Sequence, residues 1–206
     1  MLAGLFGYLL GSIPTAFLLV RWKSAIDIRS AGSGNVGTLN SFEVTRSKTI
    51  GALVLVGDLL KGVLAVLVAR WVWGLGFEHW AVAGTGALLG HNFPVWLGFR
   101  GGRGLATGAG VFGVVAWPVV VMWVFLWLVG YGVVRRVNPA NAIATIIMLA
   151  VVLLTPAETL TQTISGGIPA GQFRWFSSIL MTLILMKHIA PIREYIEERR
   201  NLKSPA

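Results

Sequence analysis

Residues 105–134 decide how often this chain crosses a membrane, and they read LATGAGVFGVVAWPVVVMWVFLWLVGYGVV. The run contains no charged residue, and it is longer than the roughly 20 residues that one upright membrane helix needs. Trp117-Pro118 stands near its middle. Because proline lacks a backbone N–H, this dipeptide marks either a turn between two short spans or a kink in one tilted span.

The composition around this run is that of an integral membrane protein. Of the 206 residues, 55% are hydrophobic and 12% are charged, whereas soluble domains carry about 25% charged residues. We therefore expect one all-helical membrane domain over residues 1–206. The run 2–20 has no basic segment before it, so we expect a retained span and not a cleaved signal. The other apolar runs of span length lie at 50–70, 80–97, 140–155 and 174–190.

The lysines and arginines choose between the two interpretations of residues 105–134. If this run is split, the chain has seven spans, with the N-terminus outside and the C-terminus in the cytoplasm. Of the 17 lysines and arginines, five, two, two and five then lie in the cytoplasmic segments 21–49, 98–104, 135–139 and 187–206. If the run is one span, eight of them lie on each side. The positive-inside rule therefore favours seven spans, with 105–116 short for a full crossing.

Two glycine-rich polar segments separate the apolar runs on the cytoplasmic side. Gly90–Thr107 reads GHNFPVWLGFRGGRGLAT, and residues 31–40 read AGSGNVGTLN. Backbone N–H groups beside guanidinium groups suit phosphate, although Arg100 and Arg103 are also explained by membrane anchoring beside a flexible turn. A transporter would place polar groups near the midplane. The one-sided arrangement favours an enzyme that handles phosphorylated substrates at the bilayer surface.

The net charge and the metal-binding residue types exclude other classes. The net charge is +9, but most of these charges flank apolar runs. They indicate orientation in the membrane and attraction for anionic lipid or phosphate, and they do not indicate nucleic acid. The chain has no cysteine and three histidines, without a metal-binding spacing. We expect no metal and no cofactor.

Four ionisable residues stand inside or at the ends of apolar runs. Asp58 and Lys61 are three residues apart on one helical face, and they form either a functional pair or an internal ion pair of the bundle. His91 and His188 end apolar runs, where each is either a hydrogen-bonded cap or a site residue. Arg193 follows His188 after four intervening residues, and Trp96 follows His91 at that spacing. The histidine–aspartate pattern that is typical of one class of acyltransferases is therefore absent.

The chain resembles the bacterial acyl-phosphate:glycerol-3-phosphate acyltransferases over most of its length. The resemblance is carried by Gly11-Ser12-Ile13-Pro14, Gly32–Gly37, Asp58–Gly62 and the complete Gly90–Thr107 segment. It implies a seven-span protein of the inner membrane with its active site facing the cytoplasm. It also implies transfer of a fatty acyl group from acyl phosphate to the 1-hydroxyl of glycerol 3-phosphate, giving lysophosphatidic acid and phosphate without a metal. Membrane lipids and an acyl-phosphate-forming enzyme are the implied partners.

The resemblance and the residue chemistry together give a set of site residues. Backbone amides around Ser33-Gly34 and Gly101-Gly102, with Arg103, are expected to hold the acyl phosphate, and His188 is expected in the glycerol 3-phosphate pocket. The expected catalytic residues are Ser33, Arg103 and His188. The expected substrate-binding residues are Gly34, Asn35, Gly37, Thr38, Asn40, Lys61, His91, Arg100, Gly101, Gly102, Asn138 and Asn141.

Several positions depart from the family pattern, and most of them concern the acceptor side. Leu39 stands where the family has threonine, and Glu43 where it has arginine. Pro191 replaces an asparagine, and the terminal acidic motif reads Arg199-Arg200. A serine pair appears as Asn138 and Asn141. The alternatives are therefore a divergent paralogue with another acceptor, a non-catalytic membrane subunit that binds lipid or phosphate, and a small anion transporter.

Overall fold

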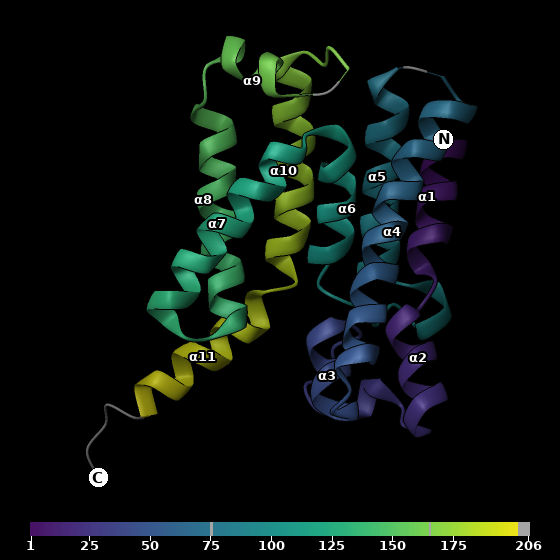
Figure 1. Ribbon diagram of the computed structural model, residues 1–206, viewed down its shortest axis with the longest axis vertical. Helices are drawn as coiled ribbons and strands as arrows, with labels where there is room; N and C mark the ends of the chain where they lie inside the picture. The colour runs from purple at the N-terminus through teal and green to yellow at the C-terminus, as the bar shows by residue number, and fades with distance from the viewer. Residues whose placement is uncertain (75, 165, 202–206) are drawn as a thin grey trace. The chain divides into compact units, whose positions relative to one another are not determined.

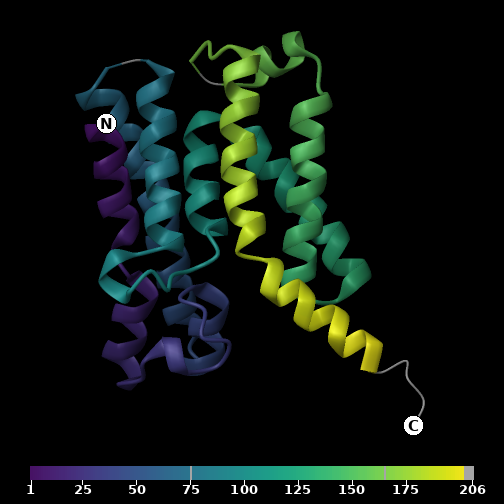
Figure 2. The ribbon, with the colours of Figure 1, turned by 180° about the vertical axis from the view of Figure 1, so that it is seen from behind.

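The structure is a computed structural model that describes residues 1–74, 76–164 and 166–201. Those residues form helices and connecting loops without a strand, as expected. The chain divides into two compact units, Met1–Ala116 and Trp117–Ala206. The single domain expected over 1–206 stays a prediction. Figures 1 and 2 show the helices of each unit from opposite sides.

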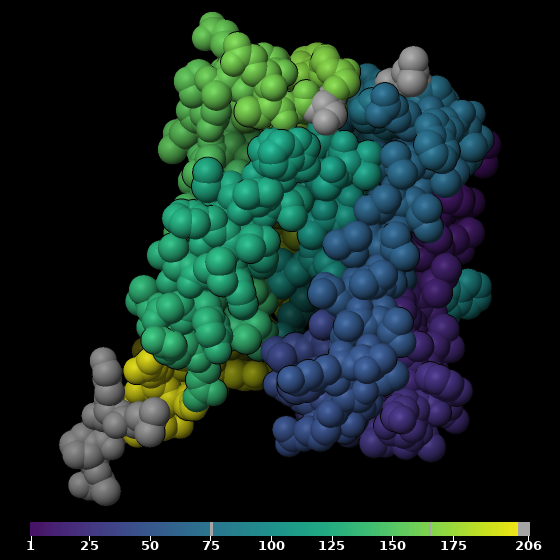
Figure 3. Space-filling view, in the orientation of Figure 1, coloured from purple at the N-terminus to yellow at the C-terminus, as the bar shows by residue number. Residues whose placement is uncertain are grey.

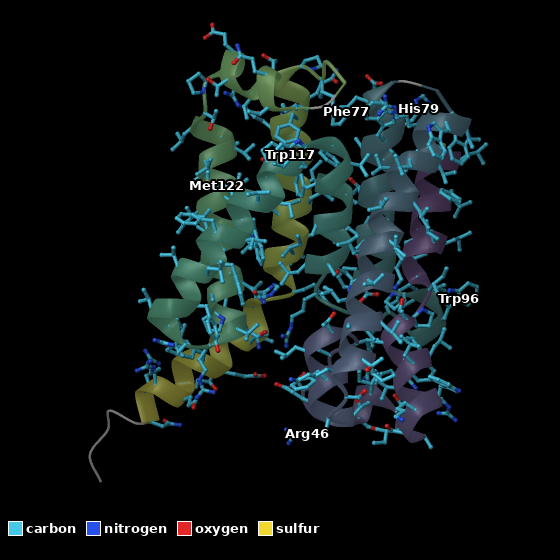
Figure 4. All side chains as sticks on the ribbon, in the orientation of Figure 1. Arg46, Phe77, His79, Trp96, Trp117 and Met122 are labelled. Carbon is cyan, nitrogen blue, oxygen red and sulfur yellow. The ribbon has the colours of Figure 1, made fainter. Side chains whose placement is uncertain are left out.

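The first unit packs three helices side by side. They are α1 (Leu2–Ser12), α4 (Lys48–Val72) and α5 (Phe77–Asn92), and α6 (Leu105–Val115) lies against α4. Shorter elements complete the unit: α2 (Thr15–Ser24), η1 (Ile28–Ser30), α3 (Thr38–Thr45) and η2 (Val95–Leu97). In Figure 4, Arg46 lies at the end of this unit formed by α3, and His79 lies at the opposite end.

Small residues allow the close contact between α1 and α5. A Cβ atom at Gly7 would collide with the carbonyl of Ala83, and one at Gly11 would collide with the carbonyl of Ala87. From the other side, Gly90 approaches the backbone of Tyr8. Without a strong hydrophobic drive between helices in lipid, such backbone approach is the main source of attraction.

The second unit contains α7 (Trp117–Val134), α8 (Val137–Leu154), α9 (Ala157–Thr163), α10 (Ala170–Met186) and α11 (Ile189–Asn201). α7 packs on α8, where the Trp123 indole donates a hydrogen bond to the Thr145 hydroxyl at 3.0 Å. The rest of α7 is apolar and exposed, with Val121, Phe125 and Leu128 each more than half exposed. Figure 3 shows α7 in teal green at the surface of this unit, and the exposure of these apolar side chains is expected of a lipid-facing helix.

The break that the charge count favoured is present. α6 ends at Val115 and α7 begins at Trp117, so Pro118 lies in the first turn of α7, where its missing N–H leaves no bond unmade. α6 has 11 residues and is short for a crossing, as expected.

Three expected spans differ from the helices, and each difference falls beside a proline. The first run breaks after Ser12, and its second half begins at Thr15, because Pro14 interrupts the helix. The third helix ends at Asn92 and not at residue 97, because Pro94 follows. The last helix ends at Met186, and α11 leaves it at an angle of 48°. The ring of Pro191 would clash with the carbonyl of Lys187 in a continuous helix.

Four helical segments of the described residues are long and apolar enough to cross a membrane, or up to five when the bent pair α10–α11 is one span. The four are Leu2–Ser24 taken across its break, Lys48–Val72, Trp117–Val134 and Val137–Leu154. The chain is therefore an all-helical membrane protein, and the count of seven stays a prediction.

Candidate active site

The loop at residues 31–40 is held by the side chain of Asn40. The Asn40 Oδ1 atom accepts a hydrogen bond from the Ser33 N–H at 3.0 Å, and its Nδ2 atom donates to the carbonyls of Ala31 and Asn35 at 3.1 and 3.0 Å. Asn40 is only 1% exposed. The Asn40 side chain therefore holds the loop around itself, and the expected contact of Asn40 with substrate stays a prediction.

The hydrogen bonds of this loop change the expected chemistry of Ser33. Its N–H is bonded to Asn40, and the Gly34 N–H donates to the carbonyl of Ala31 at 3.0 Å. Both amides that were expected to face a phosphate are therefore used within the loop. The side chain of Ser33 is exposed, so its hydroxyl is the group that this residue can offer.

The remaining expected residues of this loop lead into α3. Gly34 has a φ of +69°, which favours glycine at that position. Asn35 is half-buried, and Gly37 precedes α3 and accepts a hydrogen bond from the Ser41 hydroxyl at 2.9 Å. Thr38 is the first residue of α3 and is half-buried.

The second polar loop, residues 93–104, is held by residues from other helices. The Tyr8 hydroxyl of α1 donates to the carbonyl of Phe93 at 2.9 Å, and the Gly102 N–H donates to the carbonyl of His91 at 3.0 Å. A Cβ atom at Gly101 would collide with the His91 carbonyl, and one at Gly102 would collide with the His91 ring. Glycine is required at both positions because the loop lies directly on His91.

The two arginines of this loop differ in exposure. Arg100 is exposed and Arg103 is half-buried. In Figure 4, the Trp96 side chain of the same loop points away from the unit, and it is 63% exposed. An exposed tryptophan beside cationic side chains is typical of a membrane–water interface.

A buried charged cluster lies beneath the second loop. The Lys61 Nζ atom is 2.7 Å from Asp58 Oδ1, and the His91 Nδ1 atom is 3.5 Å from the same oxygen. All three side chains are at most 6% exposed. Lys61 and His91, both expected to bind substrate, thus have Asp58 as a common partner.

A small pocket joins this cluster to both polar loops. Val36 lines it from the first loop and Gly101 from the second. Ser12 also lines it, at the end of α1, and its fully buried hydroxyl has no hydrogen-bond partner. Ser12 was not among the expected site residues, although the Gly11–Pro14 motif could have indicated it.

A second ion pair stands before the first loop. Arg29 lies 2.6 Å from Asp27, and the hydrogen bonds from its side chain and its backbone N–H lower the pKa of Asp27 to about 2. Asp27 is therefore ionised at neutral pH and neutralises Arg29. The positive charge of Arg29, which lies next to the first loop, is therefore balanced by Asp27.

The other three expected residues belong to the second unit. His188 is fully buried in the turn between α10 and α11, and its Nδ1 atom lies 2.8 Å from the carbonyl oxygen of Ile184. Because a carbonyl oxygen only accepts, Nδ1 carries a proton. Asn138 is half-buried and Asn141 is buried, both near the start of α8. The described residues contain no group of three or more metal-ligating side chains.

The fold and the site define a class of helical membrane proteins with two glycine-rich loops, one of them cationic, beside a buried charged cluster. The profile of the glycerol-3-phosphate acyltransferase family matches residues 1–198. The chain belongs to this family, and the family predicted from the sequence motifs is confirmed.

Curated relatives and solved structures agree with this assignment. The chain is 38% identical over 187 residues to a glycerol-3-phosphate acyltransferase of Brucella anthropi, which covers 91% of this chain and 85% of the relative. It is 38% identical over 194 residues to that of Nitrobacter winogradskyi, covering 94% and 90%. The crystal structure of PlsY (YgiH), an integral membrane glycerol 3-phosphate acyltransferase, in its glycerol 3-phosphate form matches with a TM-score of 0.80 and 29% identity, covering 96% of this chain and 92% of that chain. The lysophosphatidic acid form matches with the same TM-score and coverage at 30% identity.

Proposed function

We propose that this protein transfers a fatty acyl group from acyl phosphate to the 1-hydroxyl of glycerol 3-phosphate. The products are lysophosphatidic acid and inorganic phosphate. The observation that carries the proposal is the Arg100–Arg103 loop, which is fixed on His91 by glycine-only contacts. Family membership supports the acceptor and the product, because the related crystal structures are those of the glycerol 3-phosphate and lysophosphatidic acid forms.

The reaction requires mainly that the two substrates be held in place and that the charge on the leaving phosphate be stabilised. The hydroxyl oxygen attacks the acyl carbon, an ester bond forms, and the bond from the acyl carbon to the phosphate oxygen breaks. The leaving phosphate takes the electron pair, and the hydroxyl proton passes to it. Because acyl phosphate is an activated mixed anhydride, no covalent enzyme intermediate is needed. In this proposal, Arg103 and the Ser33 hydroxyl stabilise the negative charge that develops on the leaving phosphate. His188, Asn138 and Asn141 bind and orient the acceptor.

We also propose that the protein lies in the inner membrane with seven spans and its polar loops in the cytoplasm. The support is the positive-inside distribution, because 14 of the 17 lysines and arginines then face the cytoplasm. An acyl-phosphate-forming enzyme of the same membrane surface would supply the donor. Reporters fused at Asn138 and Asn201 are expected to give a cytoplasmic signal. A periplasmic signal from either one would exclude this topology.

The purified protein tests the reaction directly. Incubation with acyl phosphate and radiolabelled glycerol 3-phosphate is expected to give labelled lysophosphatidic acid and one phosphate per product, and acyl coenzyme A in place of acyl phosphate is expected to give none. Binding of acyl phosphate without turnover would indicate a non-catalytic subunit. Uptake of labelled phosphate into vesicles without lipid product would indicate a transporter.

A second acceptor is the competing proposal, because Glu43 and Pro191 replace a cation and an amide of the family pattern. Glu43 is exposed on α3, and Pro191 is buried in α11. Release of phosphate from acyl phosphate that depends on glycerol or another uncharged alcohol, and not on glycerol 3-phosphate, would favour this alternative.

A further inference from the structure

Asp58 has contacts that a simple ion pair does not need. Its carboxylate lies in the middle of α4, is 3% exposed, and is 2.7 Å from Lys61. Removing a pair of charges from water costs free energy that their attraction often fails to recover. A buried pair of this kind is therefore weak evidence for a stabilising role. Its other partners indicate a different one.

The residues that flank the 93–104 loop on both sides contact Asp58. His91, just before the loop, places Nδ1 3.5 Å from the carboxylate. Thr107, in the first turn of α6 just after the loop, donates its hydroxyl hydrogen to the backbone carbonyl of Asp58 at 3.0 Å. The residues on which the loop begins and ends thus meet at one residue of α4.

The orientation of the His91 ring determines where the loop lies. The ring turns Nδ1 toward Asp58, and its Nε2 and Cε1 atoms contact Gly102 so closely that a Cβ atom there would overlap them. The Gly102 N–H also donates to the His91 carbonyl. If the ring rotated, Gly101-Gly102 would have to move, and the neighbouring Arg100 and Arg103 would move with them.

We propose that Asp58 is a positioning residue of the acyl-phosphate site, because its carboxylate fixes the His91 ring on which the Arg100–Arg103 loop rests. This inference rests on the proposed function, and it adds a residue to which the expected site assigned no role. Asp58 itself contacts no substrate in this scheme. It acts through His91, so its loss affects the donor and spares the acceptor.

The test is a double-mutant cycle between Asp58 and His91. Asp58→Asn keeps the shape of the side chain and removes its charge. We expect it to lower kcat/KM for acyl phosphate about 100-fold, the scale of a displacement of about 1 Å, and to change the KM for glycerol 3-phosphate by less than about threefold. In the His91→Asn background, the same substitution is expected to cost less than about threefold more. A further loss of about 100-fold in that background would mean that the two residues act independently, and it would overturn the inference.

Glu198→Gln is the matched control. Glu198 also pairs with a cation at 2.7 Å, but both partners, Arg136 and Glu198, are at least half exposed. The same change from acid to amide is expected to leave both kinetic constants unchanged. A loss equal to that of Asp58→Asn would show that the effect is not specific to the loop, and so would a loss in Asp58→Asn that is equal for both substrates.

Asp58→Asn leaves Lys61 buried without its partner, so a second variant guards against misfolding. Asp58→Asn/Lys61→Met leaves no unpaired charge, and adding His91→Asn to it is expected to change kcat/KM by less than about threefold. A large further loss would show that His91 works without Asp58.

A binding measurement separates failure of the inference from failure of the proposed function. An acyl phosphonate, which cannot transfer its acyl group, is expected to raise the melting temperature of the wild-type protein and not that of Asp58→Asn. If the wild type forms no lysophosphatidic acid, the proposed function fails, and this difference still supports the positioning role. Equal shifts in both proteins, or no shift in the wild type, overturn it.

Discussion

The two polar loops of the first unit contain similar residues but are held in different ways. The 31–40 loop surrounds the side chain of Asn40, and its partners lie at most 12 residues away. The 93–104 loop is held from outside, by Tyr8 across 85 residues of sequence and by the backbone and ring of His91. The first loop is therefore a local structure, and the second is determined by the packing of α1, α4 and α5.

This difference separates two kinds of failure. In the first loop, a substitution removes hydrogen bonds that nothing else replaces. In the second, an added atom displaces backbone that has no free space. We therefore expect the first loop to respond to a change of polarity at Asn40, and the second to a change of volume at Gly101 or Gly102.

The largest effect is expected at Arg103, where the second loop supplies charge. Arg103→Ala should lower acyl transfer at least about 100-fold, the usual loss for a charge-stabilising donor. Arg103→Lys should retain part of the rate, because lysine restores the charge without the planar group. Steady-state rates with acyl phosphate measure this. A nearly normal rate for the alanine variant would show that the loop is only a membrane anchor.

Gly102→Ala tests whether the second loop is sensitive to volume. The new methyl group would overlap the His91 ring and lie 2.8 Å from the carbonyl oxygen of Val36. A shift of the loop by about 1 Å should reduce kcat/KM for acyl phosphate roughly 100-fold.

Gly113→Ala is its control, because Gly113 lies in α6 with nothing within 4 Å of the added atom. This variant should be as active as the wild type and slightly more stable, since alanine favours helix. Equal activities for the two alanine variants would mean that the contact between the loop and His91 has no functional importance.

Asn40→Asp tests whether the first loop is sensitive to polarity. The substitution preserves volume and the acceptor for the Ser33 N–H, but it removes the donor to the carbonyls of Ala31 and Asn35. At about 1 kcal/mol for each of these two carbonyls, the lower end of the range for an unsatisfied buried group, the loss is about 2 kcal/mol, so we expect roughly a 30-fold loss of activity. Activity and melting temperature should fall together. Unchanged values of both would contradict a loop built around Asn40.

Much of this arrangement was predictable from the sequence, because the evidence was local or followed from charge. Trp117-Pro118 and the distribution of lysine and arginine predicted the break between α6 and α7. The spacing of Asp58 and Lys61 placed them on one helical face, and the 2.7 Å contact confirms that they form an ion pair, which both alternatives allow.

Other features were not predicted, because the hydropathy of a segment does not show where a helix breaks or which acceptor a backbone amide finds. The first run was expected to be continuous over 2–20, yet Pro14 breaks it, since proline interrupts a helix even within an apolar run. The amides of Ser33 and Gly34 were expected to face a ligand, but nearer acceptors within the loop bind them. The hydroxyl of Ser12 enters the pocket through the packing of α1 on α5, so the Gly11–Pro14 motif could have indicated the residue but not its position.

The smallest effect is expected just after the first loop, at Glu43, which is exposed on α3. Glu43 stands where the family pattern has arginine, so we expect a dianionic acceptor bound on this side to meet a negative charge. One restored hydrogen bond to a charged group contributes about 1.5 kcal/mol, the lower end of the usual range, because Glu43 is exposed to solvent. This free energy corresponds to about a 10-fold gain in affinity. Glu43→Arg should therefore lower the KM for glycerol 3-phosphate about 10-fold and leave that for acyl phosphate nearly unchanged. Initial rates with each substrate varied in turn measure both constants.

An equal change in both Michaelis constants would place Glu43 outside the acceptor side. A weaker native reaction without any gain for glycerol 3-phosphate would indicate a less charged acceptor. In either case, Asn40 would still hold the loop, because its bonds do not involve the side chain of Glu43.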